Sequence, residues 1–232
     1  MIIGSGLLAH AFPRVLLQRE DVCIYAAGVS NSSCADSHEF ARERLRLEDA
    51  LRQAMHVDAF VYFGTCSVAD PVARNTPYVQ HKLAMEQMVH THPHNLILRL
   101  PQAAGKTPNT HTLLNFLYAR ISRSESFNLW SMAKRNIIDV VDAASIAQQF
   151  IADNSVRNTT LNIANVVNYP MTDIVSTMER VVGKRAVYDM VEYGSEYLID
   201  ISAIRPVLKK AGIKFGDDYL EKTIDRYYEK IT

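Results

Sequence analysis

The sequence predicts an α/β fold in which a parallel sheet is wound on both faces by helices. Short apolar runs recur along the chain, and helical patterns fill the stretches between them, which is the alternation typical of such a sheet. The runs are Met1–Ile3, Val22–Ala26, Ala59–Phe63, Leu96–Leu100 and Leu161–Ile163. Runs this apolar suit strands buried on both faces. A chain of 232 residues can bury such a core without disulfides or metals.

Three helices are expected between the first four strands. Leu7–Gln18 follows a glycine turn, and Glu39–Met55 carries apolar residues among many charges. Pro77–His90 has a clear start, because proline fits the first helical position and either Asn75 or Thr76 can cap the helix.

Beyond about residue 106 the alternation loosens into helical stretches separated by short strands and turns. These stretches are His111–Ile121, Ala143–Ala152, Thr172–Val182, Ser202–Lys210 and Asp218–Lys230. We therefore expect residues 1–105 to form the core of the sheet. Residues 106–232 are expected to complete the sheet and to form a small lid, as part of one structural unit.

Composition excludes several classes of protein. The formal net charge is zero, so no basic field favours nucleic acid or anionic lipid. No run approaches the roughly 18 apolar residues that a membrane helix needs. The three cysteines (Cys23, Cys34 and Cys66) form neither a zinc pattern nor a disulfide framework, as is usual in a reducing cytoplasm. We expect a cytoplasmic protein that binds neither nucleic acid nor membrane.

Two polar clusters are interpreted as structural. The histidines of His90–His94 have no carboxylate or cysteine nearby in the sequence, so we expect a solvated turn there and no metal site. The charged run Arg42–Arg52 is expected to be a solvated helix face or a subunit contact.

A glycine turn follows the first strand. Gly4-Ser5-Gly6-Leu7-Leu8-Ala9 has the G-x-G-x-x-A spacing, in which the first glycine permits a sharp turn and the second lets the backbone approach a pyrophosphate. The same spacing occurs in ordinary strand-to-helix turns, but its position after an N-terminal apolar strand favours dinucleotide binding. The next strand, Val22–Ala26, has no carboxylate at its end to bind the adenosine ribose, so NAD and NADP both stay open.

Three side chains form a candidate acid-base site. Tyr78 and Lys82 are four residues apart on the helix that Pro77 opens, so both project from one face. An adjacent ammonium favours a phenolate, which would lower the tyrosine pKa from about 10. Thr65, at the end of the Ala59–Phe63 strand, can bind a substrate oxygen.

Several motifs then occur in a familiar order. They are Asp21–Gly28, Phe63–Ala69, the Y-x-x-x-K of Tyr78–Lys82, Arg99–Gly105, Arg135–Asp142, Leu161–Ala164 and Asp200–Phe215. With the glycine turn, this series resembles the extended short-chain dehydrogenase/reductases, the NAD-dependent epimerase/dehydratase group that acts on nucleotide sugars. The resemblance covers nearly the whole chain and implies a Rossmann-like sheet.

The resemblance also assigns roles to individual residues. Thr65, Tyr78 and Lys82 are implied as catalytic, and Gln102 and Arg135 as substrate contacts. The cofactor-binding residues that it implies are the six of the glycine turn, Ala26, Ala27, Gly28, Tyr78, Lys82 and Pro101.

The chain departs from the family pattern in three respects. The second and third strands, which carry the adenosine-binding acid, are missing, and a residue linked to proton relay in the family falls near Glu43. Cys66-Ser67 stands where 4,6-dehydratases have Asp-Glu directly after the threonine, which argues against that reaction.

The sequence therefore predicts an NAD(P)-dependent reductase or epimerase of a nucleotide-linked keto-sugar. The resemblance further implies a homodimer, formed through Glu39–Met55 and Pro77–His90, and a place in polysaccharide biosynthesis. The missing strands keep an alternative open, namely a dinucleotide-sensing or scaffold protein without turnover. The sugar, its nucleotide and the direction of the reaction are not readable from the sequence.

Overall fold

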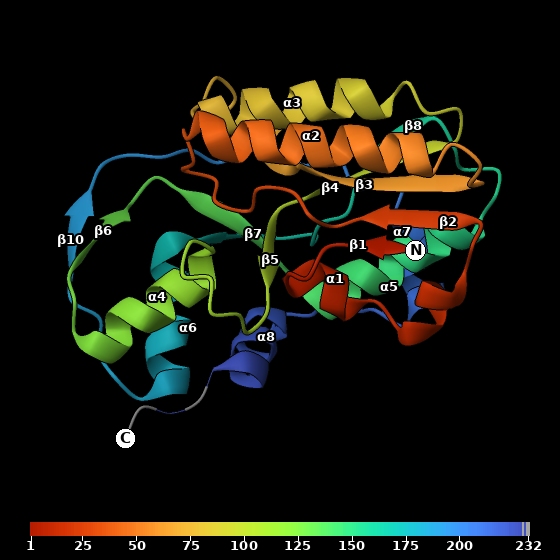
Figure 1. Ribbon diagram of the computed structural model, residues 1–232. Coiled ribbons are helices and arrows are strands. Elements are labelled where there is room, and N and C mark those ends of the chain that lie inside the picture. The colour runs from red at the N-terminus through yellow and green to blue at the C-terminus, as the bar shows by residue number, and fades with distance from the viewer. Residues whose placement is uncertain (229, 231–232) are drawn as a thin grey trace.

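The core of the molecule is a five-stranded parallel sheet, shown in the computed structural model of Figure 1, which describes residues 1–228 and residue 230. In spatial order the strands are β1 (Ile2–Ile3), β2 (Val22–Tyr25), β3 (Ala59–Thr65), β4 (Asn95–Leu100) and β8 (Thr159–Asn162). Each strand pairs in parallel with the next. All five apolar runs contribute to this sheet, and the predicted α/β fold is confirmed.

Helices cover both faces of the sheet, as the two layers in Figure 1 show. α2 and α3 lie side by side on one face, where they pack against strand residues such as Tyr25, Phe60 and Tyr62. α1, α5 and α7 cover the other face. Their bounds are α1 (Leu7–Ala11), α2 (Ser37–Gln53), α3 (Pro77–Val89), α5 (Val140–Ala152) and α7 (Arg205–Ala211).

The first strand lies at the edge of the sheet, outside β2. In the usual doubly wound order, 3-2-1-4-5-6, the first strand is central. The order found here is what remains when the second and third strands of that arrangement are absent. The connection from β1 to β2 passes over the α1 face, whereas α2 and α3 lie on the opposite face. It therefore has the opposite hand to the β2-α2-β3 and β3-α3-β4 crossovers, although crossovers are almost always right-handed.

The helix expected over Leu7–Gln18 is interrupted. α1 ends at Ala11, Pro13 follows, and a separate 3-10 turn, η1, runs from Arg14 to Gln18. Proline has no N–H to donate and its ring clashes with the preceding turn, so a continuous helix cannot pass Pro13. By contrast, α3 begins as predicted, with Thr76 as N-cap and Pro77 in the first position.

Residues beyond the fourth strand build a second hydrophobic core beside the sheet. Helices α4, α6 and α8 enclose it together with a three-stranded sheet, β5-β7-β9, and a strand pair, β6 and β10. The helices are α4 (Leu113–Arg123), α6 (Met171–Val182) and α8 (Tyr219–Tyr227), and the strands are β5 (Gln102–Ala104), β6 (Phe127–Trp130), β7 (Lys134–Asp139), β9 (Asn168–Pro170) and β10 (Tyr188–Val191). Each of the five helices expected beyond residue 106 is present among the described residues, with at least one end shifted.

Buried polar contacts dock α8 onto the start of α5. The Asp139 carboxylate accepts hydrogen bonds from Arg226 at 2.6 Å and Tyr227 at 2.9 Å, and the Tyr219 hydroxyl donates to Asp142 at 2.6 Å. The last helix is therefore fixed to the strand end from which α5 begins.

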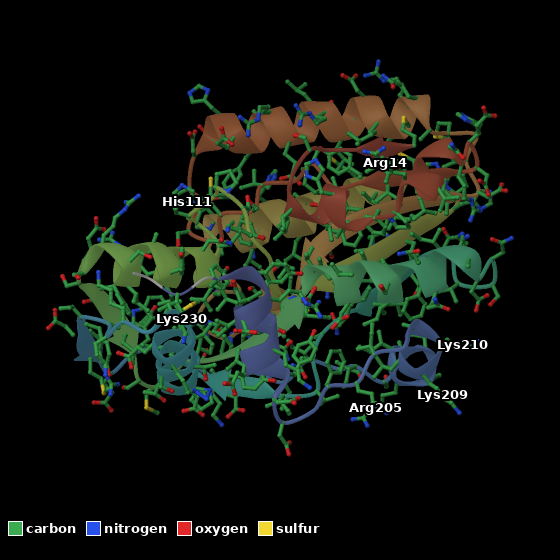
Figure 2. The ribbon with its side chains drawn as sticks, turned by 90° about the horizontal axis from the view of Figure 1, so that it is seen from below. Arg14, His111, Arg205, Lys209, Lys210 and Lys230 are labelled. Atoms are coloured by element: carbon green, nitrogen blue, oxygen red, sulfur yellow. The ribbon has the colours of Figure 1, made fainter. Side chains whose placement is uncertain are left out.

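The surface of α7 is charged on one side only. Val207 and Leu208 turn toward the sheet core, whereas Arg205, Lys209 and Lys210 are exposed and point into solvent (Figure 2). Across the described part of the chain, no helix is both long and apolar enough to cross a membrane.

Candidate active site

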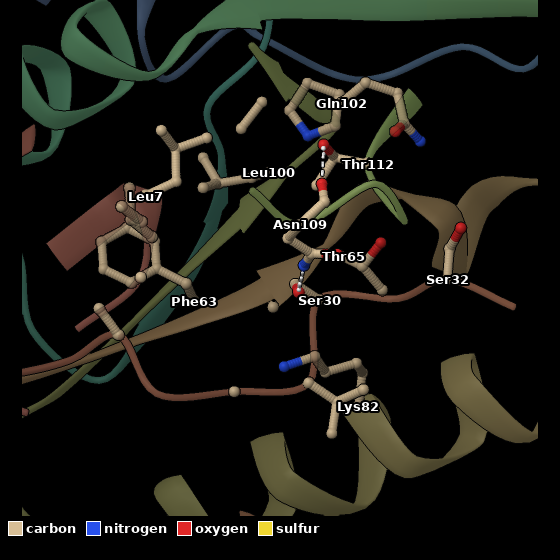
Figure 3. Close-up of a pocket in the computed structure, with 18 of the residues that line it drawn as sticks. Leu7, Ser30, Ser32, Phe63, Thr65, Lys82, Leu100, Gln102, Asn109 and Thr112 are labelled. Carbon is tan, nitrogen blue, oxygen red and sulfur yellow. Dashed lines mark hydrogen bonds between the residues drawn. The ribbon is translucent and has the colours of Figure 1, made fainter. Parts of the chain in front are cut away.

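A cavity of about 270 Å³ opens at the carboxyl ends of β1 to β4. This is the edge of an open α/β sheet where ligands bind. Its walls come from the glycine turn, the loop after β2, the end of β3, the first turns of α3 and the loop at residues 105–112 (Figure 3).

Most of the residues predicted from the sequence meet at this cavity. Those that line it are Gly6, Leu7, Leu8, Ala26, Gly28, Thr65, Tyr78, Lys82, Pro101 and Gln102. The others, Gly4, Ser5, Ala9, Ala27 and Arg135, lie outside its lining.

The two glycines of the turn serve different purposes. Gly4 has a φ of +134°, and a β-carbon there would overlap the carbonyl of Ala26 at the end of the neighbouring strand. Only glycine adopts this conformation at no steric cost. Gly6 has no heavy atom within 4 Å of the position of a β-carbon and faces the cavity. Gly4 thus shapes the turn, and Gly6 leaves the open space that a phosphate group approaching the backbone requires.

Thr65 and Tyr78 lie next to each other at the cavity, which both residues line. Thr65 ends β3, and its hydroxyl also accepts a hydrogen bond from Ser67 N at 3.1 Å, which caps the 3-10 turn η2 (Cys66–Ala69). Burial raises the pKa of Tyr78, the charge of Glu43 raises it further, and the hydrogen bond with Thr65 lowers it. The phenol is therefore protonated near neutral pH, and Tyr78 lines the cavity.

Lys82 is buried and bound by the carboxylate of Glu43, which falls near the family's proton-relay position but was not predicted as a site residue. Its ammonium donates to Glu43 Oε1 at 3.1 Å and to the Tyr62 hydroxyl at 3.2 Å. Burial alone would raise the pKa of Glu43, but Lys82, a hydrogen bond with His81 and the Val29 N–H outweigh it and lower the pKa to about 2. The structure thus differs from the expectation that Lys82 lowers the pKa of Tyr78, because Glu43 takes up the ammonium charge.

Glu43 also corrects the interpretation of the charged run Arg42–Arg52. Arg42, Arg44 and Arg52 are exposed, as expected of a solvated face, but the Glu43 side chain is only 1% exposed. Glu43 stands four residues before the buried Leu47 and therefore shares its helix face. That spacing was the signal in the sequence that could have identified Glu43 as buried.

Two further polar groups were missed. Asn109 Nδ2 donates to Ser30 Oγ at 2.9 Å, which joins the loop at residues 105–112 to the loop after β2 across one side of the cavity (Figure 3). Tyr197 lies close to Ser67 and Tyr78, and burial raises the pKa of Tyr197 to about 12. Tyr197 lies just before the Asp200-Ile201-Ser202 motif, but no spacing in the sequence links it to Tyr78.

Of the two predicted substrate contacts, only Gln102 lies at the cavity. Gln102, on β5, lines the cavity. Arg135, on β7, lies outside the lining, where its guanidinium donates to Lys134 O at 2.9 Å and lies 5.8 Å from the centre of the Trp130 ring.

Two side chains considered in the sequence analysis are structural. The Cys66 thiol donates to Arg99 O at 3.3 Å, and burial raises its pKa to about 12, so it is not a thiolate near neutral pH. His92 is buried and hydrogen-bonded to Ala54 O at 2.9 Å.

The chemistry of the lining fits a dinucleotide. Of the described residues that line the cavity, Lys82 alone carries a charge, and hydroxyl and amide groups such as Ser30, Ser32 and Asn109 surround the end nearest the loop after β2. No carboxylate in this described lining faces that end, so the residues do not discriminate between an adenosine ribose and a ribose 2′-phosphate.

A search of curated proteins found no match. Solved structures with the same fold include UDP-glucuronic acid 4-epimerase from Bacillus cereus in complex with UDP-glucuronic acid and NAD, at 18% identity and a TM-score of 0.69, covering 91% of this chain and 76% of that one. The dTDP-glucose 4,6-dehydratase from Bacillus anthracis in complex with NAD has 14% identity and a TM-score of 0.68, with 91% and 74% covered. RMD from Pseudomonas aeruginosa, complexed with NADPH, has 16% identity and a TM-score of 0.66, with 88% and 79% covered.

These identities show the common fold alone. A family model decides membership, because the model of the NAD dependent epimerase/dehydratase family matches residues 10–164, well over half of the chain. The match includes β2, β3, the start of α3 with Tyr78 and Lys82, and β4. The chain belongs to the NAD dependent epimerase/dehydratase family.

Proposed function

We propose that the protein is an NAD(P)-dependent reductase or epimerase of a nucleotide-linked keto-sugar. The observation that carries this proposal is that Thr65 and Tyr78, which lie next to each other, line the same cavity as the glycine turn. A proton donor and a dinucleotide turn on one cavity are the two parts that carbonyl reduction requires.

In this proposal each side chain has a stated task. The nicotinamide, when bound, supplies or accepts the hydride. Tyr78 gives a proton to the substrate oxygen or takes one from it, and Thr65 orients that oxygen and the phenol. Lys82 holds the ribose next to the nicotinamide. Ketoreduction is preferred, because it needs no second base, and epimerisation at C4 by oxidation and re-reduction is the close second.

Nucleotide sugars are proposed as substrates because similar structures are of enzymes named for them. Gln102 contacts the sugar from the cavity wall, and Arg135 reaches the phosphates after leaving Lys134 O. The fold is also that of a 4,6-dehydratase, so our exclusion of that reaction rests on Cys66-Ser67, which follows Thr65 without a carboxylate.

The proposed function divides the labour between the two parts of the chain. Residues 1–105 provide the dinucleotide site, and residues 106–232 complete the sheet and form the substrate lid. We further propose a cytoplasmic homodimer that serves polysaccharide biosynthesis. In the dimer, α2 and α3 of two copies form the contact, since these neighbouring helices cover one face of the molecule (Figure 1). Light scattering tests the dimer.

Replacement of one hydroxyl tests the proposed reaction. Tyr78→Phe is expected to abolish turnover of keto-sugar nucleotides, followed by NAD(P)H absorbance, while dinucleotide binding survives. Tyr169→Phe is the matched control, since its hydroxyl bonds Asn165 in the lid core, and it should leave turnover intact. Full activity in Tyr78→Phe would contradict the catalytic assignment.

A second candidate is a dinucleotide sensor without turnover. Two observations favour it: the charge of Lys82 is taken up by Glu43, and the strands that hold the adenosine half are absent. Thermal-shift measurements with NAD(H) and NADP(H), followed by a substrate panel, separate the two candidates. Binding without turnover on any sugar favours the sensor.

A further inference from the structure

The Glu43 carboxylate is the centre of a buried network directly beneath the cavity. Its Oε1 accepts from the Lys82 ammonium at 3.1 Å and from the Tyr62 hydroxyl at 3.0 Å. Its Oε2 is 3.0 Å from His81 Nε2 and accepts from Val29 N at 2.7 Å. Both oxygens are thus fully engaged, so the carboxylate has a fixed position as well as a fixed charge.

This network reaches the surface of the cavity. Gly28 and Lys82 both line it, and a β-carbon on Gly28 would overlap the Lys82 ammonium and lie 2.9 Å from Glu43 Oε1. The ion pair therefore lies immediately behind the glycine, without a side chain between it and a bound molecule.

The remaining charges around the pair cancel. Glu86, on the same helix as Lys82, makes a two-point ion pair with Arg99 at 2.9 and 2.6 Å. The carboxylate of Glu43 balances the ammonium of Lys82. Without Glu43, the cavity floor would carry one uncompensated positive charge.

We propose that Glu43 is a positioning residue that neutralises Lys82 and so prevents the cavity from disfavouring the oxidised form of the dinucleotide. This inference rests on the proposed function. The oxidised nicotinamide ring is a cation and the reduced ring is neutral, so an uncompensated ammonium nearby repels only the oxidised form. Charges a few ångströms apart in a partly buried site interact strongly enough to change the relative affinity by about tenfold.

The experiment measures the ratio of the dissociation constants for oxidised and reduced dinucleotide, by calorimetry and by the fluorescence of the reduced form. Four proteins are compared: the wild type, Glu43→Gln, Lys82→Met and the double variant. Tyr62→Phe is the control, because it removes a hydrogen bond from Lys82 without changing any charge. Thermal unfolding of each variant establishes that it is folded.

The charges of Glu43 and Lys82 predict how the ratio of dissociation constants changes in each variant. Glu43→Gln should shift the ratio toward the reduced form by about tenfold, and Lys82→Met should shift it toward the oxidised form. The double variant should return close to the wild type, and Tyr62→Phe should stay there. A ratio unchanged in Glu43→Gln, or shifts of the two single variants in one direction, overturns the inference.

If the proposed function is wrong, the same experiment gives a different result from the one that overturns the role of Glu43. A folded wild type that binds neither form contradicts dinucleotide binding itself, and the inference falls with it. Because the ratio requires no turnover, it tests the role of Glu43 equally in an enzyme and in a sensor.

Discussion

Gly28 faces the Lys82 ammonium so closely that a β-carbon at this position would overlap it. The amino-acid type at one loop position therefore decides whether the Glu43–Lys82 pair can lie beneath the cavity. The loop after β2, which the sequence assigned to cofactor contact, also makes room for a buried ion pair.

Gly28→Ala should separate Lys82 from Glu43. Overlap with a side-chain end costs about 1–3 kcal/mol of unfolding free energy, because the lysine has to move within a packed site. Dinucleotide affinity should fall as well. Urea unfolding and binding titrations measure the two effects, and a fully stable variant with normal affinity would contradict the placement of the pair.

The two glycines of the first turn should respond in opposite ways to alanine. Gly4→Ala forces a positive φ and overlaps the Ala26 carbonyl, so it should lower the unfolding free energy by about 1–3 kcal/mol. Gly6→Ala meets nothing within 4 Å, so it should leave stability unchanged and weaken dinucleotide binding. Urea unfolding together with titration separates these outcomes, and loss of stability in Gly6→Ala would contradict the open space there.

Thr65→Val should move the pH dependence of turnover. The hydrogen bond with Thr65 lowers the pKa of Tyr78, so its loss raises that pKa and moves the alkaline limb of kcat/KM to higher pH. Thr65→Ser keeps a hydroxyl and should retain the wild-type profile. The measurement is the pH profile of NAD(P)H absorbance change, and identical profiles for serine and valine would rule out the contact.

Glu43→Gln should remove a pH-dependent part of the stability. The pKa of Glu43 is lowered to about 2 in the folded protein but is about 4.3 in an unfolded chain. The stabilisation is therefore fully present above about pH 5 and is lost as the pH falls toward 2. At neutral pH the glutamine variant should lose about 3–5 kcal/mol, because Lys82 stays buried without its partner.

Urea unfolding at neutral and acid pH checks this prediction. The difference between wild type and variant should shrink as the pH falls, and the double variant with Lys82→Met should recover part of the loss. A difference that is constant with pH would show that Glu43 is not ionised in the folded protein.

The sequence predicted the sheet well, because its three inner strands, β2, β3 and β4, are short apolar runs buried on both faces, as in Phe60 and Val61 of β3. It also predicted the start of α3, where Thr76 and Pro77 act locally. The prediction was wrong at α1. The apolar pattern of Leu7–Gln18 was interpreted as one helix, although Pro13 ends it. In each case the physical cause lies within a few residues of the element.

Prediction of the site was limited by contacts between distant segments. Tyr78 and Lys82 were found because four residues of helix bring them together, and Thr65 because it ends a strand. Glu43 lies 39 residues from Lys82 in sequence. The resemblance placed the family's proton-relay residue near Glu43, but the charged run around it predicted a solvated helix face. Only the packing of α2 against α3 shows that a buried ammonium compensates it.

The peripheral position of β1 has a consequence for how the chain assembles. From β1 to β4, each strand pairs with the one that follows it along the chain, so contacts form between segments close in sequence, which speeds folding. In a sheet whose first strand is central, its loss would split the sheet in two. Here β2, β3, β4 and β8 would stay paired without β1, so an N-terminal truncation should remove the glycine turn while the rest of the sheet still folds.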